Sequence, residues 1–151
     1  MDAVQEQLVS RLRAVLNREQ VRFQEDQGST GAEPYATFQI GARSDTPLEV
    51  ELTALGDQFN VAVNEAFFFV PLDGYTDGQD WIDACGTVTQ TLISADLRIR
   101  FRRTPFGDKV GAVWVGGATT SQGAWSGHAW ACRGGKEITF PYPWFTKRDG
   151  G

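Results

Sequence analysis

The chain has 151 residues, two cysteines and a formal net charge of −5, which suits one domain with a sizeable core. It contains neither an apolar run of membrane-spanning length nor a secretory signal pattern, so we expect a cytoplasmic protein without a membrane partner. The charge is polarised: residues 1–95 hold 15 acidic and 5 basic residues, whereas residues 96–151 hold 4 and 9. The acidic total argues against nucleic-acid binding, because that requires clustered bases without a competing acidic field.

The first predicted element is an amphipathic helix over residues 2–18. Its apolar residues form one stripe at helical spacing: Val4, Leu8, Leu12, Val15 and Leu16. Acidic residues come early and arginines late, which suits the helix dipole. Such a helix must cover an apolar surface, and we expect that surface to be a sheet.

From residue 21 to residue 70 the apolar side chains recur at every second position. This alternation predicts strands over residues 21–25, 35–41, 48–53, 58–63 and 67–70. Residues 27–34 contain two glycines and a proline, and we expect a loop there. The short connections between the other strands predict an antiparallel meander, strongly curved or even barrel-like.

A second helix is predicted over about residues 77–94. Trp81, Cys85, Val88 and Leu92 form its apolar seam. Asp77 or Thr76 would cap it, with further acids in its first turns. Gly86 and the β-branched residues after it lower helix propensity, so a strand over 87–93 is the competing interpretation.

In residues 97–102 three apolar residues alternate with three arginines, which predicts a strand with one buried and one wet face. A hairpin connection at 104–109 and strands at 110–115 and 124–132 follow. The Pro- and aromatic-rich tail, residues 138–151, must be extended, because each proline biases its predecessor away from helix. The tail would dock on the protein's own sheet or at a subunit interface. Residues 1–151 thus form a single α+β domain, with both helices on one face of the sheet.

Catalytic, metal and cofactor motifs give no usable signal. The loop beginning at Asp73 resembles a calcium loop only in part, because Tyr75 and Ala84 occupy two ligand positions. His128, the one histidine, shares a strand face with Cys132 but has no third group to orient it. We therefore predict no cofactor and no metal, and favour a non-enzyme. A disulfide between the two cysteines stays open.

The acidic residues provide the main candidate surface. Glu49 and Glu51 are predicted to pair with Arg98, Arg100 and Arg102 if their strands are neighbours. Seven of the remaining acids between residues 44 and 97 would form an acidic rim of turns and a helix start: Asp45, Asp57, Glu65, Asp73, Asp77, Asp80 and Asp83.

These features predict a protein-binding module that presents its acidic rim to a basic protein partner, as a chaperone-like or immunity- or antitoxin-like adaptor would. The alternative is a small-molecule binder or enzyme with an aromatic pocket inside the curved sheet. That pocket would be lined by Phe67, Phe69, Trp114, Trp125, His128 and Trp130. A homodimer that uses the sheet edge or the tail is the third interpretation.

Overall fold

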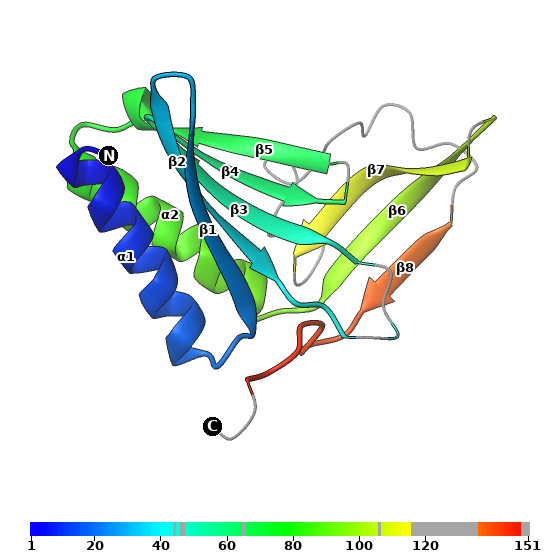
Figure 1. The fold of residues 1–151 in the computed structure, drawn as a ribbon. Helices are drawn as coiled ribbons and strands as arrows, with labels where there is room; N and C mark the ends of the chain where they lie inside the picture. Colours follow the sequence, from blue (N-terminus) through cyan, green and yellow to red (C-terminus); the bar gives the residue numbers. More distant parts are fainter. Residues whose placement is uncertain (44, 46–47, 65, 106, 116–135, 149–151) are drawn as a thin grey trace.

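The computed structural model describes residues 1–43, 45, 48–64, 66–105, 107–115 and 136–148, with backbone only for 66–68, 102–104, 107–112 and 114–115. The protein is α+β: a five-stranded antiparallel sheet, a three-stranded antiparallel sheet and two long helices (Figure 1). Both helices lie on one side of the larger sheet (Figure 1). The predicted fold class and helix number are confirmed.

Helix α1, Ala3–Arg18, follows the predicted bounds closely. The Asp2 carboxylate caps it by accepting a hydrogen bond from the Gln5 backbone N–H at 2.8 Å. Its apolar stripe is buried except for Val4, which is partly buried. Gln5 is buried as well, and its side-chain amide donates to the carbonyls of Pro34 (2.8 Å) and Ala54 (3.4 Å). A polar side chain thus joins the start of α1 to the sheet.

The larger sheet is a meander in chain order: β1 Phe23–Thr30, β2 Glu33–Ile40, β3 Val50–Leu55, β4 Gln58–Val63 and β5 Ala66–Pro71. The predicted loop at 27–34 is wrong. These residues extend β1 and β2 to a two-residue turn, where Gly31 has φ +63. Because β1 is an edge strand with mostly exposed side chains, its pairing with β2 needs no apolar alternation to form.

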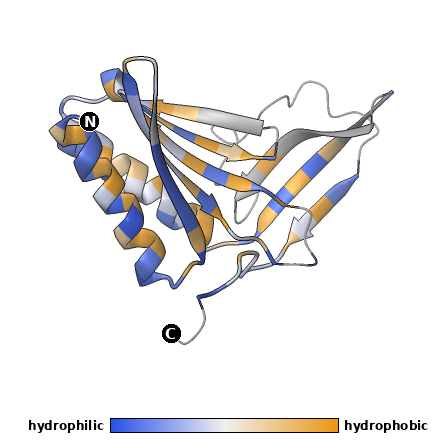
Figure 2. Cartoon of the chain, in the orientation of Figure 1, coloured by the Kyte–Doolittle hydropathy of each residue, from blue (hydrophilic) through white to orange (hydrophobic). Residues whose placement is uncertain are grey.

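One face of this sheet is apolar and the other is mixed. Figure 2 shows orange and blue residues alternating along the strands. The inward-facing side chains of β2, β3 and β4, among them Phe38, Leu52 and Phe59, are fully buried in the core that the helices cover. In the described residues β1 and β5 are the two edges of an open sheet, so the expected barrel-like curvature is not confirmed.

Helix α2, Gly78–Ile93, is continuous through the stretch where a strand was the competing interpretation. Asp77 caps it by accepting from the Asp80 N–H at 2.8 Å. The hydroxyl of Thr89 donates to the carbonyl of Cys85 at 2.9 Å, which satisfies a buried polar group inside the helix. Gly86 has a packing role: a β-carbon there would lie 3.2 Å from the Cγ of Arg11 on α1.

The smaller sheet has the order β7-β6-β8, with β6 Leu97–Thr104, β7 Gly107–Val115 and β8 Glu137–Phe140. The predicted face assignment on β6 is confirmed, because Leu97 and Ile99 are fully buried and Phe101 packs on the same core. The connection between β6 and β7 is shorter than predicted, since the strands reach Thr104 and Gly107. The predicted strand at 124–132 lies outside the described residues.

The predicted ion pairs between Glu49 or Glu51 and the arginines of residues 98–102 are wrong. Strand β3 has β2 and β4 as neighbours, whereas β6 belongs to the other sheet. Arg98 and Arg100 instead contact Glu137 of β8, at 3.3 and 3.1 Å. Strand β6 thus lies between β7 and β8, and β8 comes from the C-terminal part of the chain.

The tail docks on its own chain, as the first of the two alternatives predicted. Trp144 and Phe145 are each only 1% exposed, and the Trp144 Nε1–H donates to the carbonyl of Leu92 at 3.2 Å. The backbone of residues 144–148 hydrogen-bonds to two segments, 20–22 and 41–43. The tail thus closes the end of the sheet where β1 begins and β2 ends (Figure 1).

Candidate functional site

Three turns and two helix starts meet at one end of the molecule. The β3–β4 turn touches the end of β5, because the Leu72 N–H donates to the Asp57 carbonyl at 2.8 Å. The same turn lies beside the start of β2, since a β-carbon on Gly56 would be 3.3 Å from Glu33 Oε1. The helix starts also touch, because a β-carbon on Gly78 would lie 3.1 Å from a Val4 methyl. The antiparallel connectivity thus brings turns and helix starts that are distant in the sequence together at one end of the molecule.

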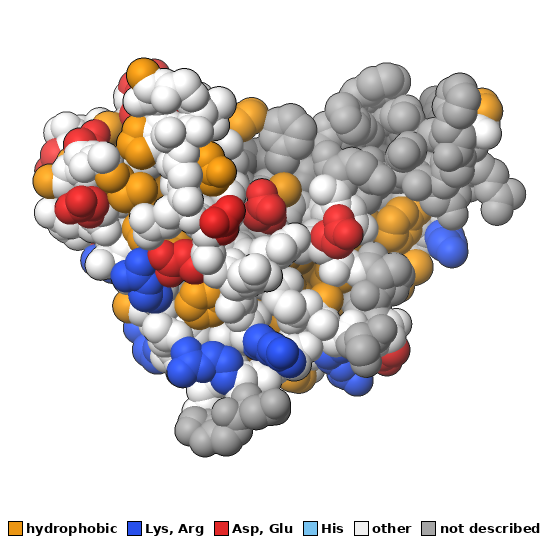
Figure 3. All heavy atoms as spheres, viewed as in Figure 1, with side chains coloured by type: hydrophobic (Ala, Val, Ile, Leu, Met, Phe, Trp, Pro, Cys, Tyr) orange, Lys and Arg blue, Asp and Glu red, His pale blue; other side chains and the backbone are white. Residues whose placement is uncertain are grey.

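Exposed carboxylates crowd this end. We call the following set the acidic end: Asp2, Glu6, Glu33, Asp57, Asp73, Asp77, Asp80 and Asp83. Figure 3 shows red side chains over this region, at the upper left, and blue ones mainly along the lower edge. Arg11 is the nearby base among the described residues, and it contacts Asp83 at 3.0 Å. The acidic end therefore keeps a strong net negative charge.

The members of the acidic end have two kinds of surroundings. Asp2 and Asp77 accept backbone hydrogen bonds as helix caps, so part of their charge stabilises the helix starts. Within the described residues no base pairs with the other carboxylates that do not cap a helix, apart from Asp83: Glu6, Glu33, Asp57, Asp73 and Asp80. Those carboxylates are the ones available to an external cation.

A groove of about 570 Å³ runs between the two helices beside the acidic end. It is lined by Ala3, Glu6, Gln7, Ser10, Arg11, Ala14, Gln79 and Ile82. The small side chains of α1 leave the space open, and Glu6 adds a carboxylate to its wall. The groove can receive a side chain of a protein that covers this end.

The structure divides the predicted acidic rim. It brings together Asp57, Asp73, Asp77, Asp80 and Asp83, and it confirms Asp77 as the helix cap. Asp45 lies in the β2–β3 connection at the opposite end, 3.9 Å from Arg43, so it does not belong to this surface. Glu65 lies outside the described residues.

Three members of the acidic end were absent from the predicted rim: Asp2, Glu6 and Glu33. Asp2 and Glu6 were seen only as helix residues. Glu33 was assigned to a loop, and recognising residues 31–32 as a hairpin turn would have placed it beside the β3–β4 turn. The sequence signal for this hairpin is Gly31 between two polar runs, a pattern that also fits a loop.

The predicted aromatic pocket is largely outside the described residues. Trp125, His128 and Trp130 are not described, and only the backbone is described for Phe67 and Trp114. Their strands, β5 and β7, contact each other. Phe69 is 50% exposed. The aromatic pocket therefore stays a prediction.

Another groove, of about 500 Å³, lies at the end opposite the acidic one. It contains none of the predicted pocket residues, and its lining mixes polar and apolar groups: Arg22, Phe23, Gln24, Gln39, Ile40, Gly41, Leu48, Glu49 and Val50.

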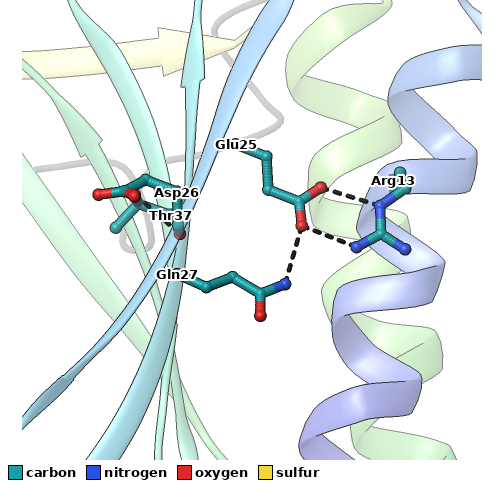
Figure 4. A network of polar contacts seen from close by, with 5 residues as sticks. All are labelled: Arg13, Glu25, Asp26, Gln27 and Thr37. Carbon is teal, nitrogen blue, oxygen red and sulfur yellow. Dashed lines mark hydrogen bonds and ion pairs between the residues drawn. The ribbon is translucent and has the colours of Figure 1, made fainter.

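Three described groups outside the acidic end have shifted pKa values, and the pKa of Arg13 is raised by its hydrogen bonds to Glu25. Arg13 of α1 donates two hydrogen bonds to Glu25 of β1, at 2.8 and 2.7 Å (Figure 4). These bonds lower the pKa of Glu25, with help from Gln27, although partial burial opposes the shift. Burial raises the pKa of the free Cys85 thiol to about 12, so this thiol is a packing group rather than a nucleophile. Cys132 lies outside the described residues.

In the portion of the chain that the structure describes, neither helix has the length and apolarity needed to cross a membrane. Across the same residues, His, Cys, Asp and Glu side chains form no group arranged to hold a metal ion. Comparisons with protein-family models, with curated proteins and with solved structures find no match to this chain.

Proposed function

We propose that this protein is a non-enzymatic, cytoplasmic binding module whose acidic end receives a basic surface of a protein partner. The observation that carries the proposal is the convergence of eight exposed carboxylates, from five separate segments, against one paired arginine among the residues that the structure describes. Carboxylates held on rigid turns and helix starts lose little freedom on binding. A field of this kind accelerates encounter with a basic surface and weakens as salt rises.

The groove between the helices supports a protein partner in particular. A basic surface that covers the helix starts would place a side chain in this groove, beside Glu6 and the Arg11–Asp83 pair. Direct contacts in the groove would make recognition depend on shape complementarity as well as on charge. In this mode the acidic end sets the association rate, and the groove contributes to specificity.

The test compares two variants of equal charge. The acidic-end variant carries Asp57→Asn, Asp73→Asn and Asp80→Asn, which spares both helix caps. Its matched control carries Asp26→Asn, Asp45→Asn and Glu51→Gln, three acids outside the acidic end. Each protein is immobilised and exposed to an extract of the source cells, and bound proteins are identified at about 50 mM and about 300 mM salt.

The wild type and the control should retain the same basic protein at low salt and release it at high salt. The acidic-end variant should bind that purified protein about tenfold more weakly, from about 0.5 kcal/mol for each of three lost exposed pairs. Retention of no basic protein at low salt, or equal binding by the acidic-end variant, would contradict the proposal.

A further inference from the structure

The end opposite the acidic one carries a concentrated positive charge. Arg22 and Arg43 flank the ends of β1 and β2, and the docked tail adds two more cations. We call the following exposed set the basic end: Arg18, Arg22, Arg43, Lys147 and Arg148. The blue side chains along the lower edge of Figure 3 belong to this region. The C-terminus of α1 and three chain segments thus contribute to one cationic surface.

Backbone hydrogen bonds fix the basic end. The Arg22 N–H donates to the Thr146 carbonyl at 2.8 Å, and the Arg43 N–H donates to the Trp144 carbonyl at 3.2 Å. The Arg148 N–H donates to the Gln20 carbonyl at 2.9 Å. The cations therefore sit on paired backbone and not on free loops, so the surface is preorganised.

Acidic side chains at this end neutralise the basic end only in part. Arg18 and Arg43 have acidic neighbours, Glu19 and Asp45, but each pair is long, at 3.9 Å, and exposed. Arg22 and Lys147 contact no acidic side chain within the described part of the chain. Glu49 lies in the groove beside Arg22, and Asp96 accepts a hydrogen bond from the Tyr142 backbone of the tail. The five cations still outnumber the four described acids at this end, Glu19, Asp45, Glu49 and Asp96, so the basic end keeps a net positive charge that attracts an anionic surface.

We infer that the basic end of one molecule docks on the acidic end of a second copy. The helices and the strands of the larger sheet all run between these two ends, so the opposite charges face away from each other and cannot neutralise within one molecule (Figures 1 and 3). Each copy carries one acidic and one basic surface, and each of these is complementary in charge to the opposite surface of a second copy. Nucleic acid and anionic membranes are less suited as occupants, because the chain carries −5 overall and its acidic end repels both.

The contact is heterologous, because two different surfaces meet, and it can therefore extend from copy to copy. The inference rests on the acidic end of the proposed function, which it deepens: a second copy would cover the acidic end and compete with the basic partner. Self-association would then keep the acidic surface occupied until the partner arrives.

Complementary variants test this head-to-tail contact. The basic-end variant carries Arg22→Gln, Arg43→Gln and Lys147→Gln, and the acidic-end variant is the one above. Sedimentation velocity at about 50 mM salt should show the wild type growing with concentration and dissociating at about 300 mM salt. Each variant alone should be monomeric, and an equimolar mixture should form dimers and stop there, because only one matched pair of surfaces remains.

Wild-type protein that stays monomeric at low salt, variants that associate on their own, or a mixture that forms no dimer would each overturn the inference. The basic-end variant separates this failure from failure of the proposed function. Its acidic end is intact, so it should bind the purified basic partner at least as tightly as the wild type does. If the mixture forms no dimer but the basic-end variant still binds the partner, head-to-tail docking is refuted and the proposed function is not.

Discussion

Replacing Trp144 by alanine tests whether the tail is part of the core. Trp144 is 1% exposed and is among the largest fully buried side chains, so its truncation should cost about 3–5 kcal/mol of unfolding free energy. The loss includes about 1 kcal/mol for the hydrogen bond to the Leu92 carbonyl. Against a total stability of about 5–15 kcal/mol, this change is large but leaves a folded population to measure.

Urea unfolding followed by far-ultraviolet circular dichroism measures this loss without relying on tryptophan fluorescence. For an m-value of about 2 kcal/mol per molar urea, the midpoint should fall by about 2 M. Trp144→Phe should lose less, because it keeps most of the apolar area. Tyr142→Ala is the matched control in the same tail, since Tyr142 is 42% exposed and should cost under about 1 kcal/mol. A loss below about 1 kcal/mol for Trp144→Ala, at an unchanged m-value, would refute core docking of the tail.

Three further predictions concern polar and thiol groups inside the fold. Arg13 lowers the folded-state pKa of Glu25, so the pair contributes stability above the unfolded pKa of about 4.3 and loses it as pH falls through the lower folded value. Glu25→Gln should cost about 0.5–1 kcal/mol at pH 7 and almost nothing at pH 2 in thermal unfolding. Gln5→Ala should cost about 1–3 kcal/mol in urea unfolding, because it removes the two hydrogen bonds that the buried Gln5 amide donates to the sheet. In a Cys132→Ser background, Cys85 should react with a thiol reagent only at the rate of unfolding.

Each of these predictions has its own control. Glu25→Gln that is equally destabilising at pH 7 and pH 2 would show that the ion pair does not contribute. Gln7→Ala, on the exposed side of the same helix, should leave the unfolding free energy nearly unchanged. An equal loss for Gln5→Ala and Gln7→Ala would show that the hydrogen bonds of the buried Gln5 amide do not contribute to stability. Rapid labelling of Cys85 in the native protein would contradict its burial.

Local periodicity accounts for the part of the fold that the sequence predicts well. The seam of Trp81, Cys85 and Leu92 defined α2 despite Gly86, and the alternation in Leu48, Val50 and Leu52 located β3, because side-chain burial imposes both patterns. The predicted strand over 21–25 covers only the first part of β1, because the residues after Glu25 are exposed on an edge and carry no alternation. The rest of β1 depends on hydrogen bonds to β2, which composition does not encode.

Pairing between distant segments explains the failures at the candidate site. Glu51 and Arg98 were matched by charge, but β8 supplies Glu137 from a segment that follows the undescribed residues 116–135. Asp45 was grouped with Asp57 because both lie in turns, yet successive turns of a meander fall at opposite ends. The number of strand reversals between two turns, and not the charge of their residues, determines whether the turns lie at the same end of the sheet.

The docking of residues 144–148 also affects how the molecule can be made. The hydroxyl of Thr146 bonds to the Ala42 carbonyl across a separation of 104 residues, so the first segments leave the ribosome long before their partner is synthesised. At about 5–20 residues per second, that interval is roughly 5–20 s. Until then the open ends of β1 and β2 lack the tail that covers them, and chaperones or premature contacts have access to them. Translation speed over roughly the last two thirds of the message therefore controls how long the nascent chain is exposed to misassembly.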